Sequence, residues 1–452
     1  MAQQEQSFKI IEVCNVEPFH EPSKPSQSPT SLPLTFFDLL WLRFPPVQRL
    51  FFYELTNSTT FFYEILLPNL KNSLSLTLEL FLPLSGNIIW PIDSSKPIIN
   101  YVHGDSVSFT VVESKESFED LSSNHCEASK RHHLIPLLKT SDEKASLISI
   151  QVTLFPNKGF CIGISTHHVA FDGKSSTNFM KSWSYITCSN PNLGNVTPCF
   201  DRSVVEDHYS GISEAYADAL MNHYGPNNKS LKVWEFPGRL KNDAVKSLFE
   251  LSPSNIQKLK KNAKNEMKMN VINLSTFSVT CAYVISCLAK TEELKDEKVS
   301  FIFSVDCRTR LEPSISSMYF GNCVVGHIIK LETKKLMGKG GFLSALEGIS
   351  ERLEKVKNGV LDGAENWLHD MLNPKESFKL YSTAGSPRFE VYDIDFGFGK
   401  PKKVDMASTD KTGAFSLSES KNHNGGIEIG LALNKHEMEA FSTLFVQGLE
   451  AI

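Results

Sequence analysis

Residues 162–186 read IGISTHHVAFDGKSSTNFMKSWSYI, and the interpretation of the chain starts from this stretch. Up to residue 165 apolar residues alternate with small or polar ones, which predicts a strand that ends at two consecutive histidines. After Asp172 and Gly173 the apolar residues recur with the spacing of one helix face, and Ser175 is expected to open that helix. The pattern therefore places His168 in a turn between a strand and a helix.

His168 is predicted to act as a general base. An imidazole titrates near neutral pH, so it can take a proton from an attacking hydroxyl group and return it to a leaving group. Asp172 follows four residues later across a glycine turn and is expected to orient the loop through an ion pair. In a chain with 13 histidines this spacing also arises by chance, so a buried, structural histidine remains the alternative.

Length and charge limit the fold and its partners. A chain of 452 residues exceeds one ordinary core and predicts two lobes of about 200 residues each. We expect an N-terminal lobe at 1–190, a crossover at 191–237, where periodicity gives way to Asn, Pro, Gly and Ser, and a C-terminal lobe at 238–452. The net charge of -5 gives no long-range attraction for nucleic acid or an anionic membrane, so neither partner is expected.

The cysteines and the N-terminus indicate a cytoplasmic protein. The nine cysteines form no CxxC pair and no regular spacing, which favours reduced thiols over disulfides or a zinc site. The N-terminus lacks the pattern of a signal peptide, and no apolar run reaches about 18 residues. A zinc site at His167, His168 and Asp172 lacks further ligands, and adjacent residues at a strand end point to opposite sides, so no metal is expected.

Apolar periodicity predicts the remaining elements. Strands are expected at 8–14, 51–53, 98–102, 107–112, 147–154, 249–251, 299–306, 391–396 and 426–433. Helices are expected at 66–80, 254–264, 275–289, 346–356 and 436–449. The stretch LPLTFFDLLWL at 32–42 predicts a short helix or turn packed on the core, and a contact with substrate is the less favoured interpretation.

Two further motifs connect the chain to a known family. YFGNC at 319–323 and DFGFGKP at 395–401 follow HHVAFDG in that order, and PLSGN at 83–87 precedes them. Together with LPLTFFDLLWL the set resembles the plant BAHD acyl-CoA-dependent acyltransferases, with their HxxxDG and DFGWG motifs. YFGNC is similar to the branch that acylates anthocyanin and flavonoid glycosides. Phe398 replaces the usual Trp of the DFGWG motif and removes an indole N–H donor.

The resemblance implies an α/β fold of the chloramphenicol acetyltransferase-like type, with two lobes, mixed sheets flanked by helices and a channel between the lobes. His168 would lie in mid-channel and deprotonate an acceptor hydroxyl that attacks the thioester of acyl-CoA, without a covalent intermediate. The rival nucleophile Cys161 lies in a strand with no base beside it and is expected to be a buried apolar residue. The resemblance also suggests a monomer.

The resemblance also assigns supporting roles around the base. Asp172 is expected to pair with Arg308 at a strand end, and Gly173 completes the turn. Asp395 is counted with the catalytic residues of such enzymes, yet two glycines and an acid in DFGFG are equally typical of a structural latch. Both interpretations of Asp395 stay open.

For the acyl-CoA donor, the resemblance implies that the start of one helix and one turn contact the CoA. The expected acyl-CoA contacts are Lys258 or Lys261, Ser275, Thr276, Ser386 and Arg388. Ser275 or Thr276 is also a natural N-cap, and a Lys-rich helix face is usually just solvated.

The expected acyl group is malonyl, moved from malonyl-CoA to a sugar hydroxyl of a flavonoid or phenolic glucoside, with no permanently bound cofactor. Its free carboxylate needs a cation, and the candidates are Lys174 and Arg310. Lys174 is equally typical of a solvated helix start. An aromatic donor such as coumaroyl-CoA is the alternative. A second alternative is a catalytically silent protein that binds phenolic ligands, but the intact HHVAFDG motif argues against it.

Overall fold

The computed structural model describes residues 7–21, 28–189, 197–206, 211–223, 225, 227–235, 240–241, 243–267, 274–292, 294, 296–373 and 379–452. Parts of the predicted crossover at 191–237 lie outside these residues. Within it the structure places two helices, α6 (Ser203–Glu206) and α7 (Ile212–His223).

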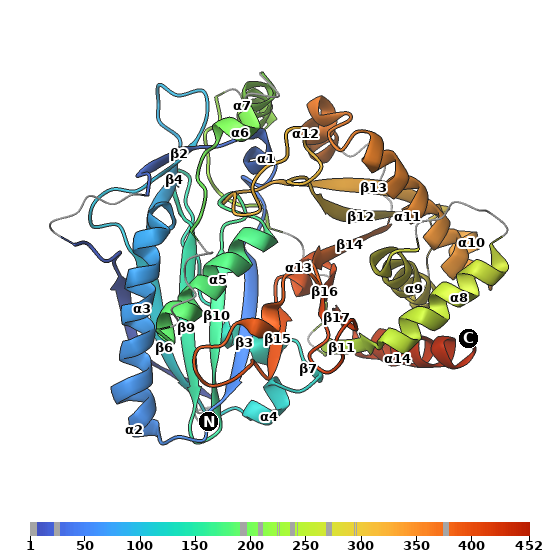
Figure 1. Ribbon diagram of the computed structural model, residues 1–452, viewed down its shortest axis with the longest axis horizontal. Coiled ribbons are helices and arrows are strands. Elements are labelled where there is room, and N and C mark those ends of the chain that lie inside the picture. The colour runs from blue at the N-terminus through green and yellow to red at the C-terminus, as the bar shows by residue number, and fades with distance from the viewer. Residues whose placement is uncertain are drawn as a thin grey trace, which may run out of the picture.

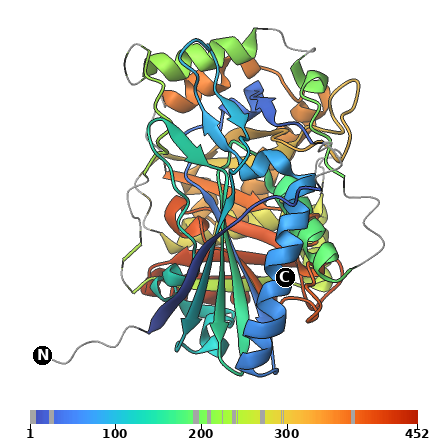
Figure 2. The same cartoon turned by 90° about the vertical axis from the view of Figure 1, so that its left-hand side faces the viewer.

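The first half of the chain builds a mixed sheet. Within the described residues it has six strands in the order β1-β6-β9-β10-β3-β15, and only the pair β6 and β9 is parallel. The strands are β1 (Phe8–Val16), β3 (Val47–Glu54), β6 (Val107–Ser114), β9 (Ile148–Phe155), β10 (Gly159–Thr166) and β15 (Lys403–Met406). Helices α3 (Leu67–Leu80) and α5 (Gly173–Thr187) lie side by side along it (Figures 1 and 2). The buried leucines Leu70, Leu74 and Leu78 recur along one face of α3, which explains why this stretch packs as a helix.

The second half builds another mixed sheet. In the described part of the chain it has seven strands in the order β13-β12-β14-β16-β17-β11-β7. The strands are β7 (His125–Glu127), β11 (Val245–Leu251), β12 (Lys298–Asp306), β13 (Val324–Glu332), β14 (Lys379–Gly385), β16 (Phe415–Glu419) and β17 (Ile427–Leu433). Its helices gather on the right of Figure 1: α8 (Pro253–Glu266), α9 (Thr276–Thr291), α10 (Thr333–Met337), α11 (Gly341–Asn358) and α14 (Lys435–Glu450). Twelve of the sixteen residues of α9 are buried, so it is the central helix of this layer.

Smaller elements cap the top of the molecule. A sheet of β2 (Ser31–Pro33), β5 (Ile98–Asn100), β4 (Asn87–Ile89) and β8 (Lys144–Ser146) lies above the first large sheet (Figure 1). The short helix α1 (Phe36–Leu39) follows β2, as LPLTFFDLLWL predicted, and all four of its residues are buried. The remaining elements lie elsewhere as well, with α2 (Thr59–Phe61) and α4 (Phe118–Leu121) at the bottom of Figure 1, α13 (Thr409–Thr412) at mid-height and α12 (Ala364–Leu372) at the top.

The two large sheets exchange strands. β15, near the end of the chain, pairs with β3 and completes the first sheet. In the opposite direction β7 pairs with β11 and completes the second sheet. The segments 1–190 and 238–452 therefore each contribute one strand to the sheet built by the other.

A buried cluster of charges joins the exchanged strand to both halves. Arg131 forms ion pairs with Asp405 of β15 and with Asp410. Lys246 of β11 lies 3.4 Å from Asp405 Oδ1 and 3.2 Å from Asp410 Oδ1. All four side chains are buried, and burial of unpaired charges is costly, so these carboxylates and cations stabilise the fold only while they stay together.

Most predicted elements are confirmed, with two corrections. The predicted strand at 391–396 is wrong, because residues 391–393 form a single turn of 3₁₀ helix and the positive φ angles of Gly397 (+94°) and Gly399 (+84°) then turn the chain. The helix expected to open at Ser175 begins at Gly173, because the Asp172 side chain accepts a hydrogen bond from the Ser175 N–H and caps it.

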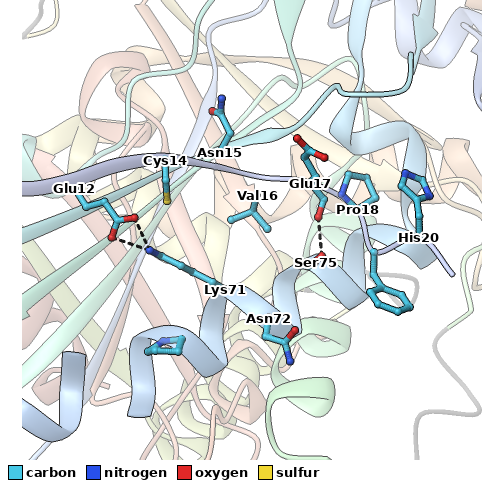
Figure 3. A pocket seen from close by; sticks show the side chains of 12 residues that line it. Glu12, Cys14, Asn15, Val16, Glu17, Pro18, His20, Lys71, Asn72 and Ser75 are labelled. Atoms are coloured by element: carbon cyan, nitrogen blue, oxygen red, sulfur yellow. Dashed lines mark hydrogen bonds and ion pairs between the residues drawn. The ribbon is translucent and has the colours of Figure 1, made fainter. Parts of the chain in front are cut away.

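An open groove of about 760 Å³ runs between β1 and α3. Figure 3 shows its polar contacts, the Lys71–Glu12 ion pair and the hydrogen bond from Ser75 to the Glu17 carbonyl. None of the residues that line it contacts His168, so this groove is separate from the predicted catalytic turn. None of the helices in the described residues combines the length and apolarity that crossing a membrane requires.

We predict that Arg131→Ala lowers the free energy of unfolding by about 3–5 kcal/mol, because it leaves two buried carboxylates without their partner. Urea unfolding followed by tryptophan fluorescence measures the change. The control is Lys158→Ala, which removes an exposed ion pair with Glu119 and should leave the midpoint unchanged. Equal midpoints for Arg131→Ala and the parent protein would show that the cluster does not support the strand exchange.

Candidate active site

The two histidines that follow β10 lie in different environments. His167 is fully buried, its Nδ1 accepts a hydrogen bond from the Val169 N–H at 3.3 Å, and burial lowers its pKa to about 3. His168 is only partly buried. Because His167 is enclosed and His168 is not, His168 is the more accessible histidine of this turn.

Aromatic rings fix the imidazole of His168. The ring of Trp41 stacks on it with centroids 4.0 Å apart and an angle of 8° between the planes, and Phe44 meets it edge-on at 6.2 Å. Burial lowers the pKa of His168 below its usual value, and this exceeds the opposite influence of Asp172. The imidazole is therefore neutral at neutral pH and able to accept a proton. Trp41 was missed as a residue of the site, although it lies in LPLTFFDLLWL.

Asp172 and Arg308 form the ion pair that the sequence analysis expected. Arg308 Nη1 lies 2.7 Å from Asp172 Oδ2, and both side chains are buried. Burial by itself would raise the pKa of Asp172, but the charge and hydrogen bond of Arg308 hold it below the usual value. No described hydrogen bond or ion pair joins Asp172 to the His168 ring, so Asp172 holds the turn by its contacts, and it affects His168 only through its charge, which raises the pKa of the imidazole.

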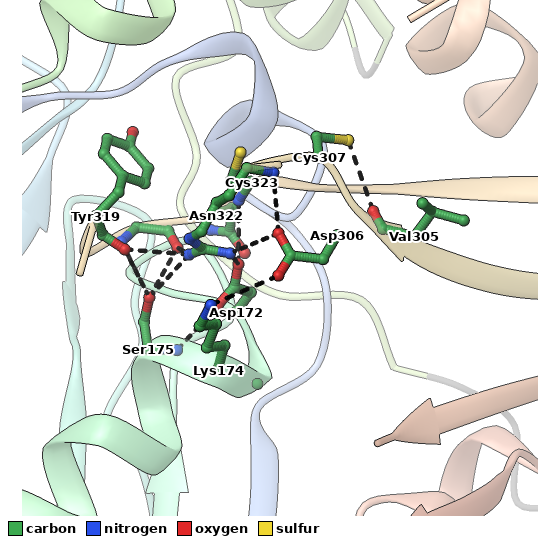
Figure 4. Close-up of polar contacts among 12 residues, drawn as sticks. Asp172, Lys174, Ser175, Val305, Asp306, Cys307, Tyr319, Asn322 and Cys323 are labelled. Carbon is green, nitrogen blue, oxygen red and sulfur yellow. Dashed lines mark hydrogen bonds and ion pairs between the residues drawn. The ribbon is translucent and has the colours of Figure 1, made fainter. Parts of the chain in front are cut away.

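The same pair holds the YFGNC segment. Arg308 Nη2 donates hydrogen bonds to the carbonyls of Tyr319 and Gly321 and to Ser175 Oγ, each at 3.1 Å. Asp172 Oδ2 also accepts a hydrogen bond from the Cys323 N–H at 3.1 Å. YFGNC and HHVAFDG are therefore two parts of one polar assembly, as Figure 4 shows.

Gly173 stands where a side chain would not fit. A Cβ atom there would lie 2.6 Å from the Phe389 ring, which belongs to the turn that contains Ser386 and Arg388. The predicted CoA turn therefore packs directly on the start of α5.

Asp395 lies in a turn of its own. Its Oδ1 accepts hydrogen bonds from the Gly397 N–H at 2.7 Å and the Phe398 N–H at 3.0 Å, and no described interaction joins it to His168. The neighbouring rings of Phe396 and Phe398 pack against the aromatic core of the first lobe. The carboxylate therefore closes a local turn at DFGFG.

The predicted acyl-CoA residues lie at two places. Ser275 caps α9 by accepting a hydrogen bond from the Ser278 N–H, and Lys260 of α8 donates to Thr276 Oγ1 at 3.2 Å. Lys258 and Lys261 are exposed, so Lys260 is the lysine that the structure brings to this helix start. At the second place Ser386 Oγ accepts a hydrogen bond from the Arg388 N–H, and the Arg388 side chain is exposed.

The two predicted partners of an acyl carboxylate meet at Asp306. Lys174 Nζ lies 3.9 Å from Asp306 Oδ2, and Arg310 Nη1 donates to the Asp306 carbonyl at 2.6 Å. In the described residues no group of three or more His, Cys, Asp or Glu side chains is arranged to hold a metal ion. Cys161 is fully buried, and burial raises the pKa of its thiol, which leaves it without nucleophilic character at neutral pH.

A family model described as the transferase family matches residues 18–447, nearly the whole chain. The chain belongs to the BAHD acyltransferases. It is 38% identical to phenolic glucoside malonyltransferase 1 of Arabidopsis thaliana, over 99% of this chain and 98% of that protein. It is also 36% identical to a malonyl-coenzyme:anthocyanin 5-O-glucoside malonyltransferase of Salvia splendens, over 96% and 94% of the two chains. Agmatine coumaroyltransferase of Arabidopsis thaliana is 34% identical, over 97% and 98%.

Solved structures show the same fold. The BAHD chain superposes on vinorine synthase with a TM-score of 0.71 at 19% identity, covering 96% of both chains. The TRI101 protein of F. graminearum, complexed with ethyl coenzyme A, gives a TM-score of 0.66 at 14% identity, over 90% of this chain and 96% of the other. The predicted two-lobed α/β fold is therefore confirmed.

We predict that Arg308→Ala destabilises the protein by about 3–5 kcal/mol, because it leaves the Asp172 carboxylate buried without its counter-charge. Arg308→Lys should restore little of the lost stability. The planar guanidinium of arginine binds Asp172 and two carbonyl groups at once, and the single ammonium group of lysine cannot do so. Thermal unfolding measures both variants. A parent-like midpoint and parent-like activity in Arg308→Ala would mean that the ion pair does not hold the catalytic turn.

Proposed function

We propose that this protein is an acyl-CoA-dependent O-acyltransferase that moves a malonyl group from malonyl-CoA to a sugar hydroxyl of a phenolic or flavonoid glucoside. The observation that carries the proposal is a neutral, partly exposed imidazole, held by Trp41 and by a turn anchored through Asp172 and Arg308. The malonyltransferases of phenolic and anthocyanin glucosides at 36–38% identity supply the substrate class.

In the proposed reaction His168 removes the proton of the acceptor hydroxyl as its oxygen attacks the thioester carbonyl. The Nδ1 atom of His168 is buried, so we assign the contact with the acceptor to Nε2. The tetrahedral intermediate then collapses, the carbon–sulfur bond breaks and the imidazolium returns its proton to the CoA thiolate. General base catalysis of this kind contributes about 10²–10⁴-fold in rate, and no covalent acyl-enzyme is required.

Three elements would receive the donor. We assign the phosphates of CoA to the start of α9 at Ser275 and Thr276, with Lys260 in place of Lys258 or Lys261. The turn of Ser386 would lie along the pantetheine arm, and it packs on Gly173 beside the catalytic turn. A channel between the lobes, through which donor and acceptor reach His168, is part of the proposal.

Asp395, Lys174 and Arg310 are assigned roles other than that of a base. We assign Asp395 to the latch that fixes the DFGFG turn, because its carboxylate is occupied by two backbone N–H groups. Lys174 and Arg310 would bind the malonyl carboxylate from their common position at Asp306. Cytoplasmic localisation and a monomeric state remain predictions from the sequence.

An aromatic acyl donor is the second candidate. Lys174 is already close to Asp306, and a cation with a partner attracts a second carboxylate less strongly. Two relatives at 34% identity are named as coumaroyltransferases, and their names imply an aromatic donor. Products from malonyl-CoA and coumaroyl-CoA, offered together with a panel of phenolic glucosides and identified by mass spectrometry, decide between the two donors.

We predict that His168→Ala lowers kcat/KM by about 10²–10⁴-fold, because the acceptor loses its base. Release of the CoA thiol from malonyl-CoA, followed with a thiol reagent, measures the rate. In the parent enzyme kcat/KM should fall only below pH 6.5, since burial lowers the pKa of His168 and the basic form persists into mild acid.

The buried neighbour provides the matched control for this variant. His167→Asn removes an imidazole that is buried away from substrate. The folded variant should therefore show the same fall of kcat/KM below pH 6.5 as the parent enzyme. Thiol release by His168→Ala at the parent rate would disprove the role of His168. No thiol release by the parent enzyme with any acyl-CoA and glucoside would instead indicate the catalytically silent binding protein.

We predict that Lys174→Ala raises the KM for malonyl-CoA by about 10–100-fold, the value of one charge-assisted hydrogen bond, and leaves the KM for coumaroyl-CoA within about twofold. Lys181→Ala is the matched control, because it removes a lysine from the same helix that pairs with Glu390. Equal changes for both donors would exclude Lys174 as the carboxylate receptor.

A further inference from the structure

A second buried carboxylate, Asp38, is connected to the turn of His168 through Asn322 of the YFGNC segment. Asp38 lies in α1 and is fully buried. Its Oδ2 accepts hydrogen bonds from the N–H of Thr35 at 3.0 Å and from the Thr35 hydroxyl at 2.9 Å. Arg202 Nη1 lies 3.8 Å from the same oxygen and supplies a counter-charge. A buried carboxylate with these partners is held in one orientation.

The other oxygen of Asp38 is directed to Asn322. Asp38 Oδ1 accepts hydrogen bonds from both the backbone N–H and the side-chain Nδ2 of Asn322, each at 3.0 Å. Asn322 is fully buried. Because the carboxylate binds the backbone and the amide of one residue together, it fixes the rotamer of that side chain.

The amide of Asn322 in turn holds the backbone of the base. Its Nδ2 donates to the carbonyl of His168 at 2.9 Å and to the carbonyl of Val169 at 3.1 Å. These contacts orient the peptide groups that follow the imidazole, and so the direction in which the His168 side chain leaves the main chain. The neighbouring residue Cys323 is bound by Asp172, so both carboxylates act on one short segment.

The segment that carries Asp38 also carries the ring that stacks on the base. Trp41 follows three residues later, in the turn after α1, and lies 4.0 Å from the His168 ring centroid. The start of α1 is anchored by Asp38 to Asn322, so the position of the Trp41 ring and that of the His168 backbone are set from the same point.

On these contacts we infer that Asp38 and Asn322 are positioning residues, which align the His168 imidazole with the acceptor through its backbone carbonyl and through Trp41. Neither residue touches a reacting atom. The inference rests on the proposed function, because it assigns these residues to the alignment of the proposed base. The turn of His168 then has two supports, the Asp172–Arg308 pair and the contacts of Asp38 in α1.

Steady-state kinetics with malonyl-CoA and a phenolic glucoside test the inference. Asn322→Ala should lower kcat by about 10–100-fold, since small displacements of a catalytic group cost this much, and should leave both KM values within about twofold. Asp38→Asn, which keeps the shape but removes the charge, should lower kcat in the same way and by less. If Asn322→Ala does not fold, Asn322→Ser keeps a short donor, and the same fall in kcat is expected.

The matched control is Asn434→Ala. Asn434 also pairs its amide with a carboxylate, that of Glu437, at the start of α14 in the second lobe. Its loss should lower the melting temperature and leave kcat unchanged. A parent-like kcat in a folded Asn322 variant, or a fall in kcat that Asn434→Ala shows equally at the same loss of stability, would overturn the inference.

The two proposals fail in different ways. If the parent enzyme releases no CoA thiol, or if His168→Ala is as active as the parent, the proposed function is wrong and the positioning role falls with it. If the parent is active and His168→Ala is not, while the folded Asn322 variant keeps the parent kcat, only the positioning role is wrong.

Discussion

The buried ion pair between Asp172 and Arg308 is the interaction on which the site depends. Asp172 belongs to the turn that follows β10 of the first sheet, and Arg308 follows β12 of the second. Because a buried charge without its partner costs about 3–5 kcal/mol, separating the turn after β10 from the end of β12 at this point is unfavourable. The turn that carries His168, the start of α5 and the YFGNC segment are all bound to it.

The chemistry of the site follows from a division of tasks between neighbouring side chains. His167 is enclosed and burial lowers its pKa to about 3, so it is a neutral structural residue, while His168 is only partly buried. Asp172 and Asp38 are both occupied by hydrogen-bond donors from the backbone or by arginine, which agrees with the imidazole as the proposed base. A site of this kind relies on the fixed direction of one ring.

Much of this arrangement could be predicted from local sequence, and some of it could not. The strand before His168, the helix after it and the cap at Ser275 follow from periodicity and capping chemistry that involve neighbouring residues only. The stacking of Trp41 and the contact of Asp38 with Asn322, 284 residues later, depend on tertiary packing that no local pattern records. The strand predicted at 391–396 failed for the same reason, since its apolar residues pack as a turn.

The strand exchange has a consequence for synthesis of the chain. Residues 49–52 of β3 find their outer partner in residues 403–406, so this edge of the first sheet stays open until nine-tenths of the polypeptide has left the ribosome. An open edge offers unpaired N–H and C=O groups to other nascent chains. Arg131 and Lys246, the buried cations that pair with Asp405 of β15, disfavour the binding of an apolar strand from another chain at this edge. They favour β15, which carries the matching carboxylate.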